Sequence, residues 1–123
     1  MSKRIIIPEF PPNPEILNPL VFKLADEIAR MRQRISSMPS DINGIAQLSK
    51  SLDRLEDELN ILGFELPALL NCPYNEGLTV KARFVPSENY NPGERIITKI
   101  IKPQINYKGQ IIQIAEIEVS TGD

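Results

Sequence analysis

The residues of this chain best suited to acid-base chemistry are its clustered carboxylates. The clusters are Asp26-Glu27, Glu56-Asp57-Glu58 and the pair Glu116 and Glu118. Two carboxyl groups can serve as general acid and general base only where their surroundings drive their pKa values apart. Each cluster falls on the polar face of a predicted helix or strand, where solubilising charge is the simpler interpretation. The carboxylates therefore predict no catalytic centre.

The sequence lacks the residue types on which most nucleophilic and metal sites depend. It contains no histidine and a single cysteine, Cys72, so nothing activates the thiol and no second thiol can pair with it. Familiar zinc sites are excluded for the same reason, and the six glycines are too scattered to form a phosphate-binding loop. We expect a protein that is not an enzyme and holds no cofactor or metal. Cys72 is interpreted as an apolar filler in a reducing, cytoplasmic setting.

The charge balance limits the class of partner. Of the 123 residues, 14 are basic and 16 are acidic, and neither sign forms a long block. Lys99, Lys102 and Lys108 give only a small basic spot near Tyr107, which is weak support for nucleic-acid binding. No apolar run approaches the roughly 18 residues that a membrane span needs. We expect neither nucleic acid nor membrane as a partner, and the missing catalytic chemistry favours protein binding.

Proline and glycine positions predict the element boundaries. Residues 1–17 are rich in proline and predict an extended lead-in, either a tethered tail or a segment that adds an edge strand. Asn18 can cap a helix and Pro19 suits its first turn, so the first helix is expected to begin there. Pro39 should end this helix. A second helix is predicted from about Ile42 to Leu62, ending at Gly63.

Both predicted helices carry an apolar stripe whose members recur at alternating steps of three and four. That spacing is typical of a coiled-coil seam or a narrow packing face. The stripe residues are Val21, Leu24, Ile28, Met31 and Ile35 in the first helix and Ile45, Leu48, Leu52, Leu55 and Leu59 in the second. Two helices alone make a thin core, so we expect a second copy to cover the stripes in a homodimer. The alternative is that both stripes pack within one chain and against the β residues.

The second half of the chain predicts short strands. Leu78–Val85 alternates apolar and polar residues, as a half-exposed strand does. Arg95–Ile101 is apolar on both faces and is expected to be a central strand, with Ile97, Lys99 and Ile101 sharing one face. Pro103 should end it.

A turn around Lys108-Gly109 leads into the last apolar run, Gln110–Val119. This run changes phase near Ile114. A bulge or strong twist would reconcile its halves, and the alternative is a strand buried on both faces at first and edge-like later. The fold class predicted is α+β: a helical hairpin or coiled-coil dimerisation segment at residues 18–63, then a small, mostly antiparallel β domain at residues 64–123.

This order of elements resembles the GrpE family, the nucleotide exchange factors of DnaK-type chaperones, from about Gly44 to Val119. The landmarks are the joint Gly63-Phe64-Glu65-Leu66, the stretch Pro73-Tyr74-Asn75, the turn Asn91-Pro92-Gly93, and the Gly109 turn followed by an isoleucine-rich strand and Ala115. The resemblance implies a homodimer held by its helices, whose β domain binds the nucleotide-binding domain of a DnaK-type chaperone and promotes ADP release. The contact residues it implies are Tyr107, Lys108, Gly109, Gln110, Gln113 and Val119.

The chain departs from the family pattern within that implied surface. The Gly109 turn is typically followed by basic residues that face the chaperone, and Gln110 and Gln113 stand in those places here. Loss of these charges should weaken binding to a general chaperone, which suggests a dedicated partner. The alternative function is a dimeric interaction adaptor that keeps the GrpE-like fold without exchange activity.

Overall fold

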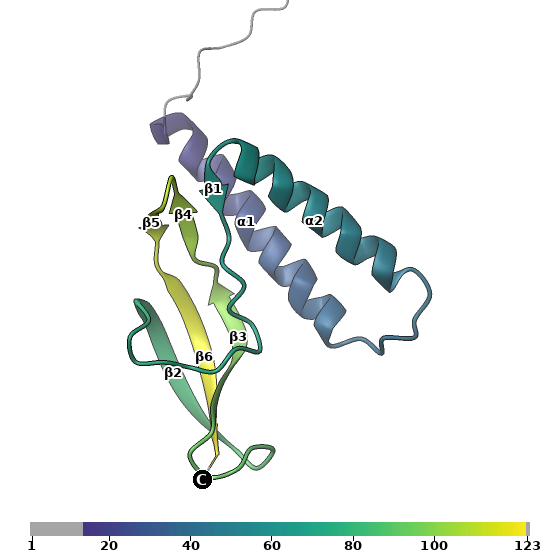
Figure 1. The fold of residues 1–123 in the computed structure, drawn as a ribbon, viewed down its shortest axis with the longest axis vertical. Helices are drawn as coiled ribbons and strands as arrows, with labels where there is room; N and C mark the ends of the chain where they lie inside the picture. The colour runs from purple at the N-terminus through teal and green to yellow at the C-terminus, as the bar shows by residue number, and fades with distance from the viewer. Residues whose placement is uncertain (1–13, 123) are drawn as a thin grey trace, which may run out of the picture.

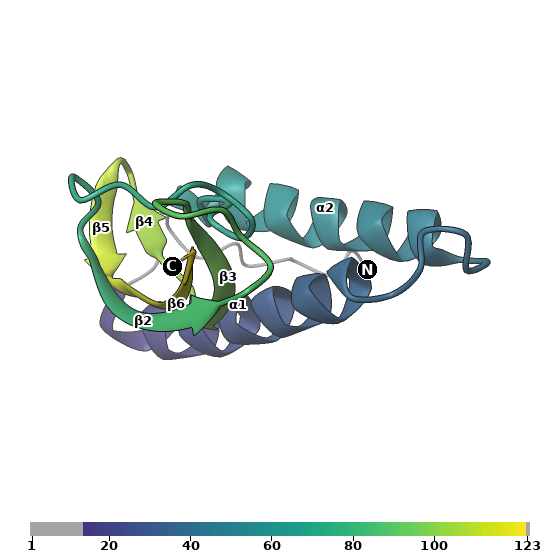
Figure 2. The same ribbon diagram turned by 90° about the horizontal axis from the view of Figure 1, so that it is seen from below.

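Two helices and a β module make up the part of the chain described by this computed structural model, residues 14–122, of which residues 14–18 are described by backbone alone. Helix α1 spans Pro14–Ser36 and helix α2 spans Ile45–Ile61. The helices lie side by side and run in opposite directions, and the β module lies beside them (Figure 1; Figure 2). Residues 1–13 of the predicted lead-in, residues 1–17, lie outside the described residues.

Helix α1 begins at Pro14, so the predicted start at Asn18 is wrong and residues 14–17 are helical rather than extended. A proline fits the first turn because the N–H groups there have no helical acceptor. Pro19 lies inside the helix and costs it one backbone hydrogen bond. Burial of Val21 and Ala25 just beyond offsets that cost, since packing of an apolar face stabilises a helix more than local propensity does.

Two glycines set the limits of α2. Gly44 has a φ of 95° at the N-cap, so the helix begins at Ile45, three residues later than predicted. Gly63 follows its last turn, also with a φ of 95°, and its N–H donates to the carbonyl oxygen of Asn60 at 2.9 Å. A Cβ on Gly63 would lie 3.3 Å from the ring of Tyr107. Gly63 therefore meets both a conformational and a steric requirement where the chain leaves the helix.

Within the described residues, six strands form two three-stranded sheets. The smaller sheet is antiparallel, in the order β1-β4-β5, with β1 at Phe64–Glu65, β4 at Ile105–Tyr107 and β5 at Gln110–Gln113. The larger sheet has the order β2-β6-β3, with β2 at Val80–Ser87, β6 at Ala115–Gly122 and β3 at Arg95–Lys102. In it β2 is parallel to β6, and β3 is antiparallel. The predicted α+β class, helices followed by a small, mostly antiparallel β module, is confirmed.

The central strand of the larger sheet is β6, which corrects the expectation that Arg95–Ile101 would be central. The outer edge of β3 is nevertheless covered. The N–H of Asn71 donates to the carbonyl oxygen of Ile97 at 2.7 Å, and the N–H of Ile97 donates to that of Cys72 at 2.9 Å. The linker backbone thus replaces a further strand and satisfies edge groups that would otherwise be open to pairing. This cover explains why β3 is apolar although it lies at an edge.

Two β-bulges decide which residues of β3 share a face. Its pairing with β6 shifts between Ile97 and Lys99 and again between Ile100 and Lys102. Each bulge adds one residue, so side chains return to the same face after three residues instead of two. Ile97 is fully buried, and Ile100 packs against the same core cluster. Lys99 and Lys102 both face away from it, so the prediction that Lys99 shares the face of Ile97 is wrong.

The phase change at Ile114 marks the point where the chain passes from one sheet to the other. Strand β5 ends at Gln113 in the smaller sheet, and β6 begins at Ala115 in the larger one. The predicted run Gln110–Val119 is therefore two strands. The alternation in its second half follows from one buried face, since the side chains of Ala115, Ile117 and Val119 are at most 1% exposed.

Buried side chains form two clusters, one for each sheet. The first joins the helices to the smaller sheet and consists of Val21, Ala25, Ile28, Leu52, Leu59, Phe64 and Ile105. The second lies on the inner face of the larger sheet and consists of Ile97, Ala115, Ile117 and Val119. The first cluster thus holds the helical hairpin to the β module through a shared core.

No helix among the described residues is long and apolar enough to cross a membrane.

Candidate partner-binding surfaces

The turn between β4 and β5 carries the most exposed of the predicted contact residues. Lys108 and Gly109 have φ values of 49° and 81°, the left-handed pair that a two-residue hairpin turn requires. Both residues are exposed, as is Gln110. The Lys108 ammonium lies 5.3 Å from the centre of the Tyr107 ring, which shields one side of the turn. We call Lys108, Gly109 and Gln110 the hairpin tip.

Of the other predicted contact residues, Val119 is buried and Tyr107 and Gln113 are half-buried. Val119 is fully buried in the core of the larger sheet, so its side chain is not part of a contact surface. The Gln113 side chain donates through Nε2 to the carbonyl oxygen of Pro103 at 2.7 Å, which anchors the strand. The Tyr107 ring lies 4.8 Å from the ring of Phe64 and packs against the helical core cluster. The predicted surface is therefore reduced to the hairpin tip.

The hairpin tip is tied to the end of α2. The N–H of Lys108 donates to the carbonyl oxygen of Gly63 at 2.9 Å. That contact, with the close approach of Gly63 to the Tyr107 ring, fixes the tip relative to the helices.

Each helix divides its predicted stripe into a buried row and an exposed row. Val21, Ile28, Leu52 and Leu59 are between 1% and 6% exposed, and Met31 and Ile35 pack against the same cluster. Ile45 is half-buried. Three stripe residues that each follow a covered one by three positions are exposed, Leu24 by 45%, Leu48 by 52% and Leu55 by 49%, whereas Met31, at the same step from Ile28, is covered. Leu20, one turn before Leu24, is 55% exposed.

The geometry of an antiparallel pair places both exposed rows on one side. A step of three residues turns by about −60° around each helix axis, and reversing the direction of one helix mirrors that turn. The exposed leucines therefore lie beside the buried residues that pack with Phe64 and Ile105, displaced in the same sense on both helices. We call Leu20, Leu24, Leu48 and Leu55 the leucine stripe. Of the ten predicted dimerisation residues, three are therefore exposed within one chain, and the others are buried or half-buried.

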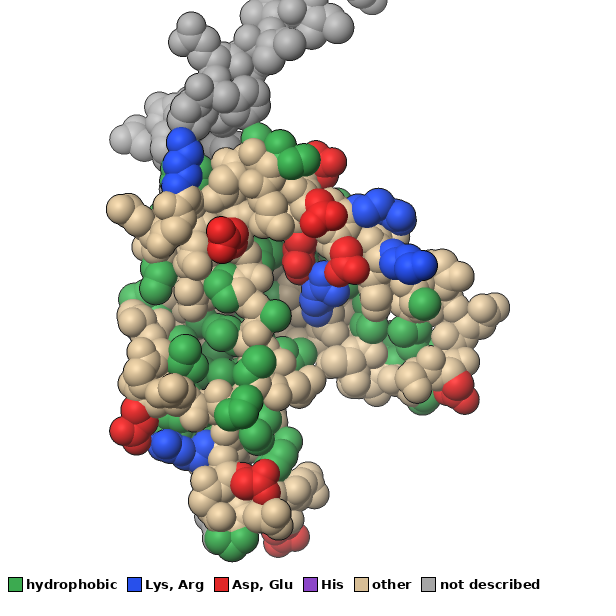
Figure 3. Space-filling view, viewed as in Figure 1, with side chains coloured by type: hydrophobic (Ala, Val, Ile, Leu, Met, Phe, Trp, Pro, Cys, Tyr) green, Lys and Arg blue, Asp and Glu red, His purple; other side chains and the backbone are tan. Residues whose placement is uncertain are grey.

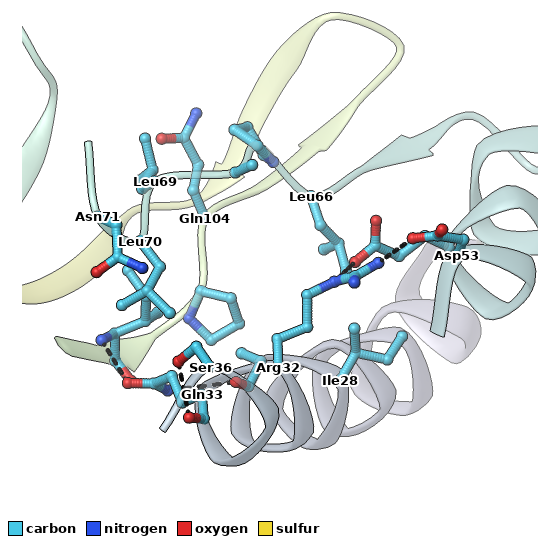
Figure 4. A pocket seen from close by; sticks show the side chains of 16 residues that line it. Ile28, Arg32, Gln33, Ser36, Asp53, Leu66, Leu69, Leu70, Asn71 and Gln104 are labelled. Atoms are coloured by element: carbon cyan, nitrogen blue, oxygen red, sulfur yellow. Dashed lines mark hydrogen bonds and ion pairs between the residues drawn. The ribbon is translucent and has the colours of Figure 1, made fainter. Parts of the chain in front are cut away.

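A cavity of about 490 Å³ lies between α1, α2 and the linker that follows β1 (Figure 4). Its polar end is Arg32, whose Nε donates to Glu56 at 2.9 Å and whose Nη2 donates to Asp53 at 2.7 Å. The hydrogen bond to Glu56 raises the pKa of Arg32, with Asp53 adding to the effect against the cost of burial. The cavity therefore combines an ion-paired end of net charge −1 with apolar walls that include Ile28, Leu66 and Leu69.

Gln33 at the edge of this cavity couples α1 to the larger sheet. Its side-chain amide forms two hydrogen bonds with the backbone of Ile100, and it also donates to the carbonyl oxygen of Ala29. The sequence gives no sign of this role, since a glutamine in a helix is ordinarily a surface residue. The contact adds a second link between helices and β module, independent of the hydrophobic core.

The described residues contain one thiol, and their charged side chains are unevenly distributed. Among them, no group of three His, Cys, Asp or Glu is placed to hold a metal ion. Cys72 is half-buried, and its thiol donates to the carbonyl oxygen of Ala68 at 3.3 Å. Acidic and basic side chains gather along α2, and hydrophobic ones lie over the β module, on the face shown in Figure 3.

Comparison with known proteins adds no relative: no protein-family model matches this chain, and no curated protein matches it. The family resemblance drawn from the sequence landmarks stays a prediction.

Proposed function

We propose that this chain is a cytoplasmic, GrpE-like co-chaperone that acts by binding rather than by catalysis. In this proposal the leucine stripe pairs two copies through their helices. The β module of each copy then contacts the nucleotide-binding domain of a DnaK-type chaperone and promotes ADP release.

The separation of the two surfaces is the observation that carries the proposal. The leucine stripe lies on the two helices, whereas the hairpin tip lies in the turn between β4 and β5. A dimer formed through the stripe would therefore use residues distinct from those of the tip. The glycines at the landmark joints of the resemblance, Gly63, Gly93 and Gly109, each have a positive φ that favours glycine.

Exchange activity needs only differential binding. A protein that binds the open state of a nucleotide cleft more tightly than the closed state shifts the equilibrium towards opening by the ratio of the two affinities. The partner's nucleotide then dissociates faster, although the factor itself performs no reaction. A rigid contact surface is required, and the bond between Lys108 and Gly63 provides rigidity at the tip.

The second candidate is a dimeric adaptor that keeps the fold without exchange activity. It is favoured by the hairpin tip itself, where Gln110 replaces a basic residue, and by Gln113, whose amide is engaged with Pro103. These losses leave Lys108 as the single charged side chain of the tip. An adaptor would bind a chaperone or another protein without changing its nucleotide kinetics.

The release of fluorescent ADP from the DnaK-type chaperones of the same organism tests both candidates. The chaperone is loaded with the labelled nucleotide, and release is followed after addition of excess unlabelled nucleotide and increasing amounts of the chain. Faster release that saturates supports the exchange factor. Binding without acceleration supports the adaptor, and the absence of both with every chaperone of the organism rejects the proposal.

A further inference from the structure

The outer face of the larger sheet carries an ordered array of charge. Lys81 and Arg83 on β2 lie opposite Glu116 and Glu118 on β6. On the other side of β6, Lys102 pairs in register with Glu116, and Lys99 with Glu118. Each glutamate of the central strand is thus flanked by a basic residue on both neighbouring strands. We call these six residues the basic sheet face.

The two sides of the array differ in how far their charges are paired. On the β2 side, Arg83 contacts Glu118 at 2.8 Å and Lys81 contacts Glu116 at 3.7 Å. On the β3 side, Lys99 and Lys102 are exposed and form no ion pair within residues 14–122. The glutamates are already partnered from β2, so the two lysines of β3 remain to interact with another molecule.

The bulges of β3 are what bring both lysines to this face. With regular alternation from Ile97, Lys99 would point towards the core and Ile100 away from it. The first bulge turns Lys99 outward, and the second does the same for Lys102. Ile101, next to the second bulge, is 46% exposed and adds an apolar contact beside the lysines.

Charge is segregated between this face and the rest of the chain. Four of the 14 basic residues and two of the 16 acidic residues lie in the array, so the face carries +2 and the remaining residues together carry −4. A positive face on an acidic protein steers association with a negative surface, and it disfavours self-association through the same face.

We infer that the basic sheet face is a docking surface for an acidic surface of a protein partner. Nucleic acid fits less well, because its evenly spaced phosphates would meet Glu116 and Glu118 in the middle of the array. A protein surface can place carboxylates against Lys99 and Lys102 and neutral groups against the glutamates. The inference rests on the proposed function for the identity of the partner, and it assigns to this face the electrostatic attraction that Gln110 no longer supplies.

Association kinetics with the DnaK-type chaperone test the inference. Lys99→Gln/Lys102→Gln and the charge-reversed Lys99→Glu/Lys102→Glu are compared with wild type at several salt concentrations. Lys23→Gln/Lys50→Gln, which removes two exposed lysines from the helices, is the matched control. At low salt the neutral variant should associate about three-fold to ten-fold more slowly and lose its salt dependence, whereas the reversed variant should associate more slowly still and become faster as salt is added. The control should stay within about two-fold of wild type.

Three results would overturn the inference, and they are distinguishable. Wild type that binds no chaperone rejects the proposed function and this inference with it. Wild type that binds, with unchanged kinetics in both sheet variants or an equal loss in the control, rejects only the basic sheet face. Micromolar binding of a labelled DNA or RNA oligonucleotide that is lost in Lys99→Gln/Lys102→Gln assigns the face to nucleic acid instead. Circular dichroism of each variant verifies that it is folded.

Discussion

The side-chain amide of Gln33 pairs with both backbone polar groups of Ile100, as a neighbouring strand would. The N–H of Ile100 donates to Gln33 Oε1 at 2.9 Å, and Gln33 Nε2 donates to the carbonyl oxygen of Ile100 at 3.0 Å. A single side chain thereby closes the edge of β3 between its two bulges. It also sets the position of α1 against the β module.

Replacing Gln33 should destabilise the fold out of proportion to its partly exposed position. Gln33→Ala leaves the N–H and carbonyl of Ile100 without partners, at a cost of about 1–3 kcal/mol in the free energy of unfolding. Urea denaturation at a fixed protein concentration measures the change. The control is Gln47→Ala, an exposed glutamine of α2 that should change stability by less than about 0.5 kcal/mol. Equal effects of the two substitutions would show that the pairing with Ile100 is unimportant.

Gly63 and Gly93 form a matched pair for separating backbone strain from steric conflict. Both have positive φ, 95° and 85°, but only Gly63 has a neighbour that a Cβ would crowd, the Tyr107 ring at 3.3 Å. Gly93→Ala should lower the free energy of unfolding by about 1–2 kcal/mol, because alanine is strained in the left-handed conformation. Gly63→Ala should lower the free energy of unfolding by more than this. It should also broaden or shift the NMR signal of the Lys108 amide, which donates a hydrogen bond to the carbonyl oxygen of Gly63. A Gly93→Ala variant that is the less stable of the two contradicts this account.

The leucine stripe should control dimerisation without controlling folding. Leu48→Asp/Leu55→Asp places charge on exposed positions, so we expect a folded monomer near 13.9 kDa where wild type gives twice that mass in size exclusion with light scattering. Leu52→Asp, by contrast, buries a charge in the intrachain core and should unfold the protein. Lys50→Asp is the control on another face of α2 and should stay dimeric. A wild-type monomer at tens of micromolar would rule out the dimer.

The helices and their boundaries show what local patterns can and cannot predict. The steps of three and four predicted both helices and their apolar stripes. They could not predict that Leu52 would be covered and Leu48 left open, because that depends on the side to which Phe64 and Ile105 attach. The start of α1 was misplaced because Asn18-Pro19 is a strong local signal, and packing of Val21 and Ala25 outweighs it.

The basic sheet face lay beyond sequence reasoning for a different reason. Strict alternation places Lys99 on the face of Ile97, so Lys99 and Lys102 could not be assigned to one surface. The recurrence of isoleucine and lysine at steps of three in Ile97-Thr98-Lys99-Ile100-Ile101-Lys102 is the signal that two bulges are present. In the same way, Val119 was predicted at a contact surface through a family resemblance, whereas the alternation of β6 already indicated a buried face.

Gln110 and Gln113 both stand where the resemblance implies basic residues, but the structure gives them different surroundings. Gln113→Ala removes the hydrogen bond to Pro103 and should cost about 1 kcal/mol in stability, whereas Gln110→Ala at the exposed tip should change stability by less than about 0.5 kcal/mol. If the tip contacts a chaperone, Gln110→Ala should weaken that binding, and Gln113→Ala should weaken it only as far as its lower folded fraction requires. Urea denaturation and chaperone affinity, measured on both variants, separate the two tasks. The reverse pattern, with Gln113 governing affinity at full stability, would move the contact from the tip to the Gln113 end of strand β5.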